Sequence, residues 1–333
     1  MKTLPYRDIV TATNLTRAGS LTEATRLIQA ALGGTTAPVE SPLLKTVTAK
    51  EQARGFFART YRSQAGTRAY KLFVPSGYNG QLCPLIVMMH GCTQSAEDFA
   101  AGTRMNELAE EATFLVAYPE QTASANTQKC WNWFKRGDQQ RDRGEPSLIA
   151  GITRQIMHEY TIDRERVYVA GMSAGAAAAA VLGATYPDIY AAVGAHSGLV
   201  CGLAQDVRSA FAVMKSGDGP RRSPETDVPI ATIVFHGDCD TTVNKGNSDR
   251  FADNLLMPAY AKRIEEGRAS GGHAYTKTVY TDASGRSVLE QWIVHGAGHA
   301  WSGGSSAGSY TDVRGPDASR EMVRFFLAHR LAE

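Results

Sequence analysis

The sequence predicts an α/β fold in which a mostly parallel central sheet is flanked by helices, with an N-terminal helical extension. Short apolar runs alternate with helical patterns from about residue 55 onward. The runs are almost continuously apolar, which is typical of strands buried on both faces of a parallel sheet. At 333 residues the chain is long enough for one large domain of this kind or for two smaller ones.

The expected strands are the short apolar runs, and the expected helices lie between them. The strands are expected at residues 70–74, 84–89, 114–118, 166–170, 190–195, 230–235 and 288–294. The helices are expected near residues 97–111, 147–160, 174–186, 249–264 and 317–331. Residues 274–281 and 288–294 flank the turn sequence DASG, which predicts a hairpin at the end of the sheet.

The first forty residues differ from the rest of the chain. Residues 15–32 carry apolar side chains at the i, i+3, i+4 spacing of an amphipathic helix, which Gly33 and Gly34 end. The following TTAPVESP has the composition of a linker. We therefore expect a helical extension with its linker at residues 1–45 and the α/β domain at 46–333. The extension covers an apolar patch of the body or, as the less favoured alternative, mediates binding.

Composition narrows the classes of partner. The chain is 43% hydrophobic and 20% charged, with a net charge of +2 and no basic tract, so nucleic acid is not an expected partner. No apolar run reaches the ~20 residues of a membrane span. The N-terminus lacks the apolar stretch of a secretory signal, which favours a cytoplasmic protein, or a secreted one if a leader was removed. A homo-oligomer is compatible with these features.

The five cysteines do not follow a metal-binding pattern. Cys92, Cys130, Cys201 and Cys239 fall in or beside loops between the expected strands and helices. Bridges between Cys92 and Cys130 and between Cys201 and Cys239 are conceivable. Reduced thiols are the favoured interpretation for each pair, because a cytosolic protein keeps its cysteines reduced.

The strongest chemical signal is the segment VYVAGMSAGAAAAA at residues 167–180. It contains Gly-x-Ser-x-Gly with Ser173 in the centre, after an expected strand and before an Ala-rich helix. This is the context of the nucleophile turn in the α/β-hydrolase fold, where a sharp strand-to-helix turn exposes the serine hydroxyl. We therefore expect an α/β-hydrolase fold with Ser173 as the nucleophile.

A nucleophilic serine needs a base and an acid, which in this fold follow it in the order acid, then histidine. Asp240 comes just after the expected strand 230–235, with Asp238 as its rival. His299 lies in a Gly-rich turn after the last expected strand, with His295 as its rival. His295 and His299 have no glutamate between them as a zinc protease would require, so no metal and no cofactor are expected.

The oxyanion that forms during acyl transfer requires preorganised N–H donors. One donor is expected from the backbone of Ala174, the residue after the nucleophile. The other is expected from the backbone of Cys92, in the loop His90-Gly91-Cys92 that follows the strand at 84–89.

Five segments in this order, HGCTQSAEDF, CWNWF, GMSAGAAAA, HGDCDTTV and GAGHAWSGG, give the sequence a family resemblance. Over roughly residues 60–330 it resembles the poly(3-hydroxybutyrate) depolymerase esterases, which are relatives of feruloyl and acetylxylan esterases. The resemblance implies hydrolysis of carboxylic esters by Ser173, Asp240 and His299, with an oxyanion loop at residues 90–92. It does not fix the substrate.

The substrate pocket is expected near a long polar insertion at residues 119–146. Trp131 in this insertion, Trp301 just after His299, and His196 are the pocket candidates. The alternatives are that the tryptophan anchors the insertion to the body and that His196 caps a strand, which is the favoured role for His196.

The functional hypothesis is a serine carboxylic-ester hydrolase that acts through an acyl-enzyme on 3-hydroxybutyrate-type oligomers or polyester, or on short-chain esters. The alternatives are a feruloyl or acetylxylan esterase and an acyltransferase, with a peptidase less favoured. The rival from a different class is a non-catalytic binder of polyester granules that attaches through the N-terminal helix.

Overall fold

The computed structural model describes residues 54–218, 230–253, 255 and 260–331. A ten-stranded sheet runs through this part of the chain in the order β1-β2-β4-β3-β5-β6-β7-β10-β9-β8. Its strands are β1 Gly55–Ser63, β2 Gly66–Val74, β3 Cys83–Met89, β4 Leu115–Pro119, β5 Ile162–Met172, β6 Ala192–His196, β7 Ala231–Gly237, β8 Ala261–Arg268, β9 Ala274–Thr281 and β10 Ser287–Val294. The short β11 Trp301–Ser302 and β12 Thr311–Asp312 pair with each other in parallel.

The centre of the sheet is parallel and its two edges are antiparallel. Neighbouring strands from β4 through β3, β5, β6 and β7 to β10 are parallel. At one edge β2 pairs antiparallel with β4 and β1 with β2, and at the other β9 pairs antiparallel with β10 and β8 with β9. The predicted α/β-hydrolase fold is thus confirmed, and so is the hairpin of residues 274–281 with 288–294.

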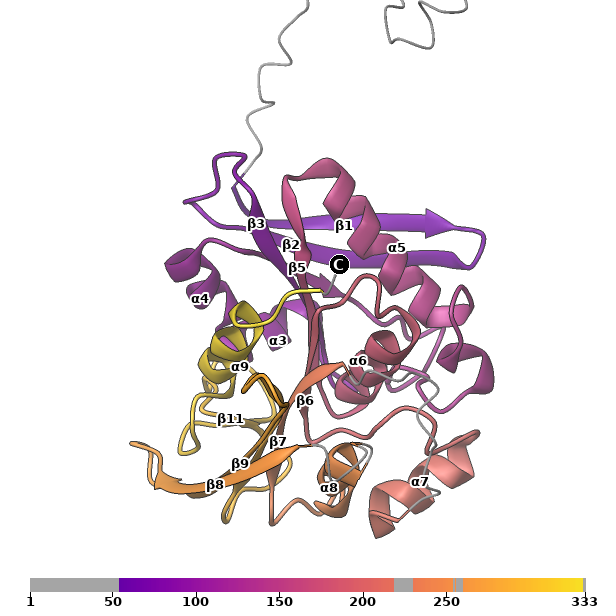
Figure 1. Cartoon of the computed structure of the whole chain (residues 1–333). Helices are drawn as coiled ribbons and strands as arrows, with labels where there is room; N and C mark the ends of the chain where they lie inside the picture. The colour runs from indigo at the N-terminus through magenta and orange to yellow at the C-terminus, as the bar shows by residue number, and fades with distance from the viewer. Residues whose placement is uncertain (1–53, 219–229, 254, 256–259, 332–333) are drawn as a thin grey trace, which may run out of the picture. The chain divides into compact units, whose positions relative to one another are not determined.

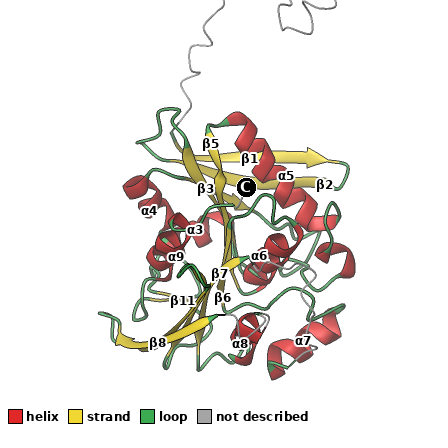
Figure 2. Cartoon of the chain, in the orientation of Figure 1, coloured by secondary structure: helices red, strands yellow, loops and turns green. Residues whose placement is uncertain are grey.

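Helices cover both faces of the sheet (Figures 1 and 2). On one face lie α3 Ala96–Thr103, α4 Met105–Ala112 and α9 Ala318–Leu327, and on the other lie α5 Gly144–Glu159, α6 Ala174–Thr185, α7 Val207–Ser216 and α8 Gly246–Asp253. A short 3-10 helix, η1 Arg136–Gln139, precedes α5. Separate apolar clusters fill the two interfaces, and β3 shows why: Leu85, Val87 and Met89 belong to one cluster, and Ile86 and Met88 to the other.

Two predicted elements are wrong in part. The helix expected at 97–111 is broken into α3 and α4 by Arg104, whose backbone is left-handed with φ 54°. The helix expected at 249–264 ends as α8 at Asp253, and Ala261–Arg268 forms the strand β8 instead. Among the described strands β8 is the last of the sheet and pairs with β9 alone; most of its side chains are exposed, which agrees with its charged sequence AKRIEEGR.

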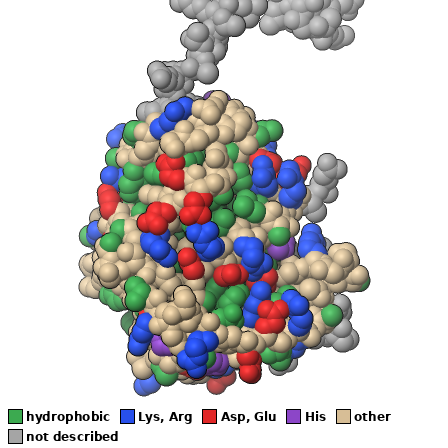
Figure 3. Space-filling model, turned by 90° about the vertical axis from the view of Figure 1, so that its left-hand side faces the viewer, with side chains coloured by type: hydrophobic (Ala, Val, Ile, Leu, Met, Phe, Trp, Pro, Cys, Tyr) green, Lys and Arg blue, Asp and Glu red, His purple; other side chains and the backbone are tan. Residues whose placement is uncertain are grey.

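The predicted N-terminal helix at 15–32 lies outside the described residues, and the boundary between residues 45 and 46 stays a prediction. None of the helices in the described ranges has both the length and the apolar character needed to cross a bilayer. On the face seen in Figure 3, acidic and basic side chains are interspersed.

Candidate active site

Ser173 lies at a sharp turn between β5 and α6. Its backbone angles are φ 56° and ψ −121°, a conformation that non-glycine residues rarely adopt. Its N–H donates to the carbonyl of His196 at 2.9 Å. A Cβ on Gly175 would come within 2.1 Å of the Met89 carbonyl oxygen, so only glycine lets α6 approach β3 this closely. The sequence Gly-x-Ser-x-Gly is thus required by the packing around this turn.

Asp240 and His299 form a hydrogen-bonded pair. They lie at the C-terminal end of the parallel strands, as Ser173 does. Asp240 follows β7 and His299 follows β10, and both strands run parallel to β5. His299 Nδ1 and Asp240 Oδ2 are 2.7 Å apart. The carboxylate accepts this N–H, which leaves His299 Nε2 unprotonated and able to act as a base.

The carboxylate of Asp240 is buried and held by several donors. Its Oδ1 accepts the backbone N–H groups of Thr242 and Val243, each at 2.8 Å. His236 Nε2 lies 3.4 Å from Oδ2. Burial raises the pKa of Asp240, but the hydrogen bonds from His236 and His299, the charge of His299 and the Val243 N–H together hold this pKa well below its usual value. Asp240 is therefore ionised and fixed in orientation.

The two rival residues pair with each other. Asp238 Oδ2 lies 2.8 Å from Nδ1 of His295, and Asp238 Oδ1 accepts the Gly296 N–H at 2.7 Å. The side chains of this second pair are more exposed than those of Asp240 and His299. The structure thus gives two separate Asp–His pairs, of which the buried one contains the two residues favoured from the sequence.

The two expected oxyanion donors are unoccupied N–H groups. Within the described part of the chain, neither Cys92 N nor Ala174 N has a hydrogen-bond acceptor, whereas Gly91 N donates to Gln94 Oε1 at 2.8 Å and Thr93 N to the Gln128 carbonyl at 2.7 Å. A Cβ on Gly91 would lie 3.7 Å from Cβ of Ser173, so this loop borders the serine. Two N–H groups without an acceptor, one in the serine's own turn and one in a loop that borders it, are compatible with the expected oxyanion donors.

The expectation of reduced thiols is wrong for one pair of cysteines. Cys92 and Cys130 form a disulfide, whereas the structure does not join Cys201 to Cys239. The bridge ties the oxyanion loop to the insertion at 119–146. Sequence spacing alone did not reveal this contact, because the Gln128 and Cys130 segment meets the loop only in the folded chain.

Removing this disulfide is expected to lower the free energy of unfolding by about 2–4 kcal/mol, because the bridge restricts the unfolded chain. The bridged residues are 38 positions apart, which is a substantial loop. Denaturant unfolding of the double variant Cys92→Ser with Cys130→Ser measures the loss. Cys239→Ser, which changes an exposed thiol, is the control and should unfold like the wild type. Equal stability of all three proteins would contradict the prediction.

His196 and Trp301 lie beneath the site rather than on its surface. Both are 1% exposed, and their rings stack with centroids 5.0 Å apart. His196 Nε2 accepts the Ser302 N–H at 2.9 Å, and its main-chain carbonyl accepts the N–H of Ser173. Burial lowers the pKa of His196 to about 3, so the ring is neutral. His196 thus connects the turn of Ser173 to the loop after His299, which agrees with the strand-capping alternative.

Comparison with known proteins places this architecture in a family. A family model described as esterase PHB depolymerase matches residues 68–271. The chain belongs to this family. The matched span includes Ser173 and Asp240 and ends before His299.

This chain has both a depolymerase and a feruloyl esterase among its relatives. It is 31% identical over 258 residues to a poly(3-hydroxyalkanoate) depolymerase C from Paucimonas lemoignei, covering 73% of this chain and 62% of the relative. It is 28% identical over 232 residues to a feruloyl esterase B from Neurospora crassa, covering 65% of this chain and 77% of the relative. The chain therefore spans less than two thirds of the depolymerase's length.

The fold is also that of a solved esterase structure. The acetyl xylan esterase from Aspergillus awamori superimposes with a TM-score of 0.65 at 19% identity, covering 82% of this chain and 99% of that one. At 19% identity this similarity shows a shared fold alone.

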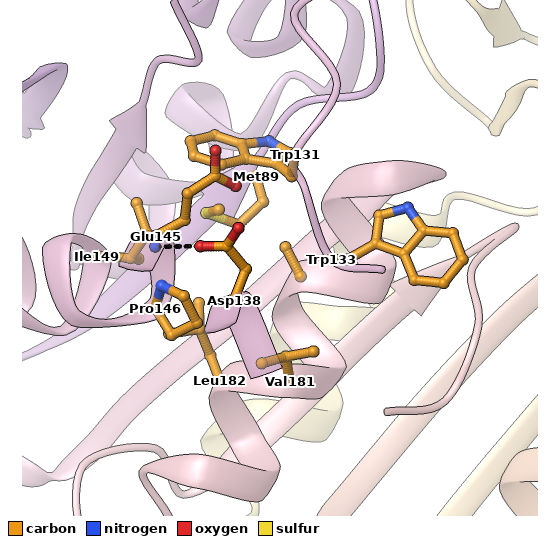
Figure 4. A pocket seen from close by; sticks show the side chains of 10 residues that line it. Met89, Trp131, Trp133, Asp138, Glu145, Pro146, Ile149, Val181 and Leu182 are labelled. Carbon is orange, nitrogen blue, oxygen red and sulfur yellow. Dashed lines mark hydrogen bonds between the residues drawn. The ribbon is translucent and has the colours of Figure 1, made fainter. Parts of the chain in front are cut away.

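Trp131 anchors the insertion at residues 119–146 to the body of the domain. Its side chain is 0% exposed, and its Nε1 donates to the His90 carbonyl at 3.0 Å. Figure 4 shows it with Glu145 at a small pocket of about 10 Å³. This placement favours the anchoring alternative, and we leave Trp131 out of the proposed substrate pocket.

A buried polar cluster behind Trp131 went unnoticed in the sequence. The Glu145 carboxylate accepts the backbone and side-chain N–H groups of Asn132, each at 2.7 Å, and a hydrogen bond from Gln121. Arg68 hydrogen-bonds Gln121 and lies 3.7 Å from Glu145. Burial raises the pKa of Glu145. These residues fix the insertion on which Cys130 sits.

Gln94 is the second feature that sequence reasoning missed. It is buried, and besides accepting the Gly91 N–H it donates to Asp98 Oδ2 at 2.8 Å. It therefore sets the shape of the oxyanion loop. The segment HGCTQ that carries the family resemblance contains this glutamine, which was the available signal.

Proposed function

We propose that this chain is a serine carboxylic-ester hydrolase that works through an acyl-enzyme at Ser173. The observation that carries the proposal is the buried pair of Asp240 and His299, 2.7 Å apart, at the sheet edge where the strained Ser173 turn lies. A serine at such a turn with a histidine held by a carboxylate is the arrangement that activates a hydroxyl for acyl transfer.

The mechanism assigns each residue one task. His299 Nε2 takes the proton from Ser173 as Oγ attacks the ester carbonyl, and the backbone N–H groups of Cys92 and Ala174 stabilise the oxyanion. His299 then gives the proton to the leaving alcohol, which leaves an acyl-Ser173 ester. Water attacks this ester with His299 again as the base, and His299 then returns the proton to Ser173 Oγ as the bond to the acyl group breaks and the acid is released. Asp240 keeps the proton on His299 Nδ1 and stabilises the imidazolium.

The proposed substrates are hydroxyalkanoate oligomers or polyester of the 3-hydroxybutyrate type, or short-chain esters. The likeness to a poly(3-hydroxyalkanoate) depolymerase C supports the first class, and the likeness to a feruloyl esterase B supports esters of other acids. The fold does not distinguish them. The disulfide between Cys92 and Cys130 favours an oxidising compartment over the cytoplasm expected from the sequence.

The test combines turnover with covalent labelling of the full chain. We expect hydrolysis of p-nitrophenyl esters from acetate to dodecanoate, fastest for short acyl groups, and labelling of Ser173 by a fluorophosphonate as seen by peptide mass spectrometry. Hydroxybutyrate oligomers and ethyl ferulate then separate the substrate classes, and product analysis with added alcohol separates hydrolysis from acyl transfer. Inactivity on every ester, or labelling of a different residue, would refute the proposal.

A further inference from the structure

Tyr310 is a large exposed side chain in an unusual backbone conformation. Its side chain is 49% exposed, and its φ is 52°. A bulky residue rarely adopts this left-handed conformation, and where it does, the surrounding structure must hold it there. This raises the question of what fixes an aromatic ring at this position.

Tyr310 is attached to the oxyanion loop and to the segment that follows the candidate base. Its carbonyl accepts the N–H of Trp301, just after His299, at 2.7 Å. Its hydroxyl lies 3.2 Å from Oγ1 of Thr93, which follows Cys92. Thr93 Oγ1 donates to the Cys92 carbonyl at 2.6 Å, so the tyrosine hydroxyl is the donor to Thr93. The ring therefore spans from the loop of the candidate base to the oxyanion loop.

The segment before Tyr310 is fixed against α3. Ser309 N and Oγ donate to the two carboxylate oxygens of Asp98 at 2.9 and 2.6 Å, and Gln94 Nε2 lies 3.2 Å from the Ser309 carbonyl. A Cβ on Gly308 would come within 2.4 Å of the Asp98 carbonyl oxygen, so the backbone packs directly on the helix. The exposed ring is thus held in place by its neighbours.

We propose that the ring of Tyr310 forms one wall of the substrate site and contacts the apolar part of the ester beyond the scissile carbonyl. The carbonyl must lie between Ser173 and the oxyanion loop, and Tyr310 is hydrogen-bonded to that loop. An aromatic ring offers a large rigid contact area to an alkyl chain or a hydroxyacyl repeat. This inference rests on the proposed function, because it assumes that an ester is processed at Ser173.

The test is the dependence of kcat/KM on chain length in variants of Tyr310. Tyr310→Asn removes the ring and retains a residue that tolerates the left-handed backbone. We expect its kcat/KM to fall about 10-fold for butyrate and longer p-nitrophenyl esters, mainly through KM, and by less than about twofold for acetate. Tyr310→Phe retains the ring and should keep the wild-type chain-length dependence.

A parallel series of acetate esters with lengthened alcohols covers the other side of the carbonyl. A length-dependent loss in either series supports the wall. Val313→Ala is the control, because Val313 is also a large exposed apolar side chain on the same segment, with 59% of it exposed. If the unfolding temperature of Tyr310→Asn differs from that of the wild type, Tyr310→Trp is used in its place. This variant should shift the preference of the enzyme toward esters with shorter chains.

The outcomes separate this inference from the proposed function. In one outcome the wild type turns over esters normally, while the ratio of variant to wild-type kcat/KM, for Tyr310→Asn or Tyr310→Trp, stays the same for every chain length in both series. This outcome would overturn the proposal that Tyr310 forms a wall of the substrate site and would leave the proposed esterase function intact. Absence of wild-type turnover and of fluorophosphonate labelling at Ser173 would overturn both.

Discussion

Replacement of Ser173 by alanine is expected to lower kcat for p-nitrophenyl butyrate by about 10⁵-fold. The change removes the oxygen that we propose forms the acyl-enzyme, while the proposed oxyanion donors, the N–H groups of Cys92 and Ala174, stay in place and should leave a small residual rate. Alanine has the same preference against a φ of 56° as serine, so the turn should not relax. Steady-state kinetics with purified enzyme measures the effect.

The folded state of this variant must be checked in the same preparation. We expect its thermal unfolding to match that of the wild type within about 2 °C, because the buried contacts of β5 and α6 involve its neighbours rather than the hydroxyl. Fluorophosphonate labelling should disappear together with turnover. A variant that retains more than a tenth of the wild-type kcat would show that another residue is the nucleophile.

The sequence was most informative where function depends on local backbone. The turn at Ser173 requires glycine on both sides because α6 passes so close to β3. This requirement can be recognised from the five consecutive residues Gly171 to Gly175. The order of Asp240 and His299 after Ser173 follows from the parallel strands that carry them. Buried strands such as β3 were equally clear, because both of their faces are covered and both must be apolar.

The sequence was least informative where contacts join distant segments. β8 is charged because it lies at the sheet edge, so its period did not distinguish it from a helix. The sequence is compatible with Trp131 lining a pocket or anchoring a loop, and its burial with the hydrogen bond to the His90 carbonyl distinguishes the two. The Cys92–Cys130 bridge and the attachment of Tyr310 to Thr93 likewise depend on how the insertion and the last loop return to the oxyanion loop.

Asp240→Asn is expected to lower kcat by about 10⁴-fold through a change in the tautomer of His299. In the wild type, Oδ1 of Asp240 accepts two backbone N–H groups, from Thr242 and Val243. The amide oxygen of asparagine must take this position, which turns its NH₂ toward Nδ1 of His299. Nδ1 then accepts a hydrogen bond, and the ring proton moves to Nε2, the atom that takes the proton from Ser173 in the proposed mechanism.

Asp238→Asn is the matched control for this argument. Asp238 also accepts a backbone N–H on Oδ1, from Gly296, and faces a histidine Nδ1 with Oδ2. The same substitution should therefore flip the tautomer of His295 but reduce kcat by less than about threefold, because His295 is not the proposed base. Comparable losses in the two variants, or a larger loss in Asp238→Asn, would transfer the role of base from His299 to His295. A loss confined to Asp240→Asn ties catalysis to the buried pair, since exchange of carboxylate for amide is common to both proteins.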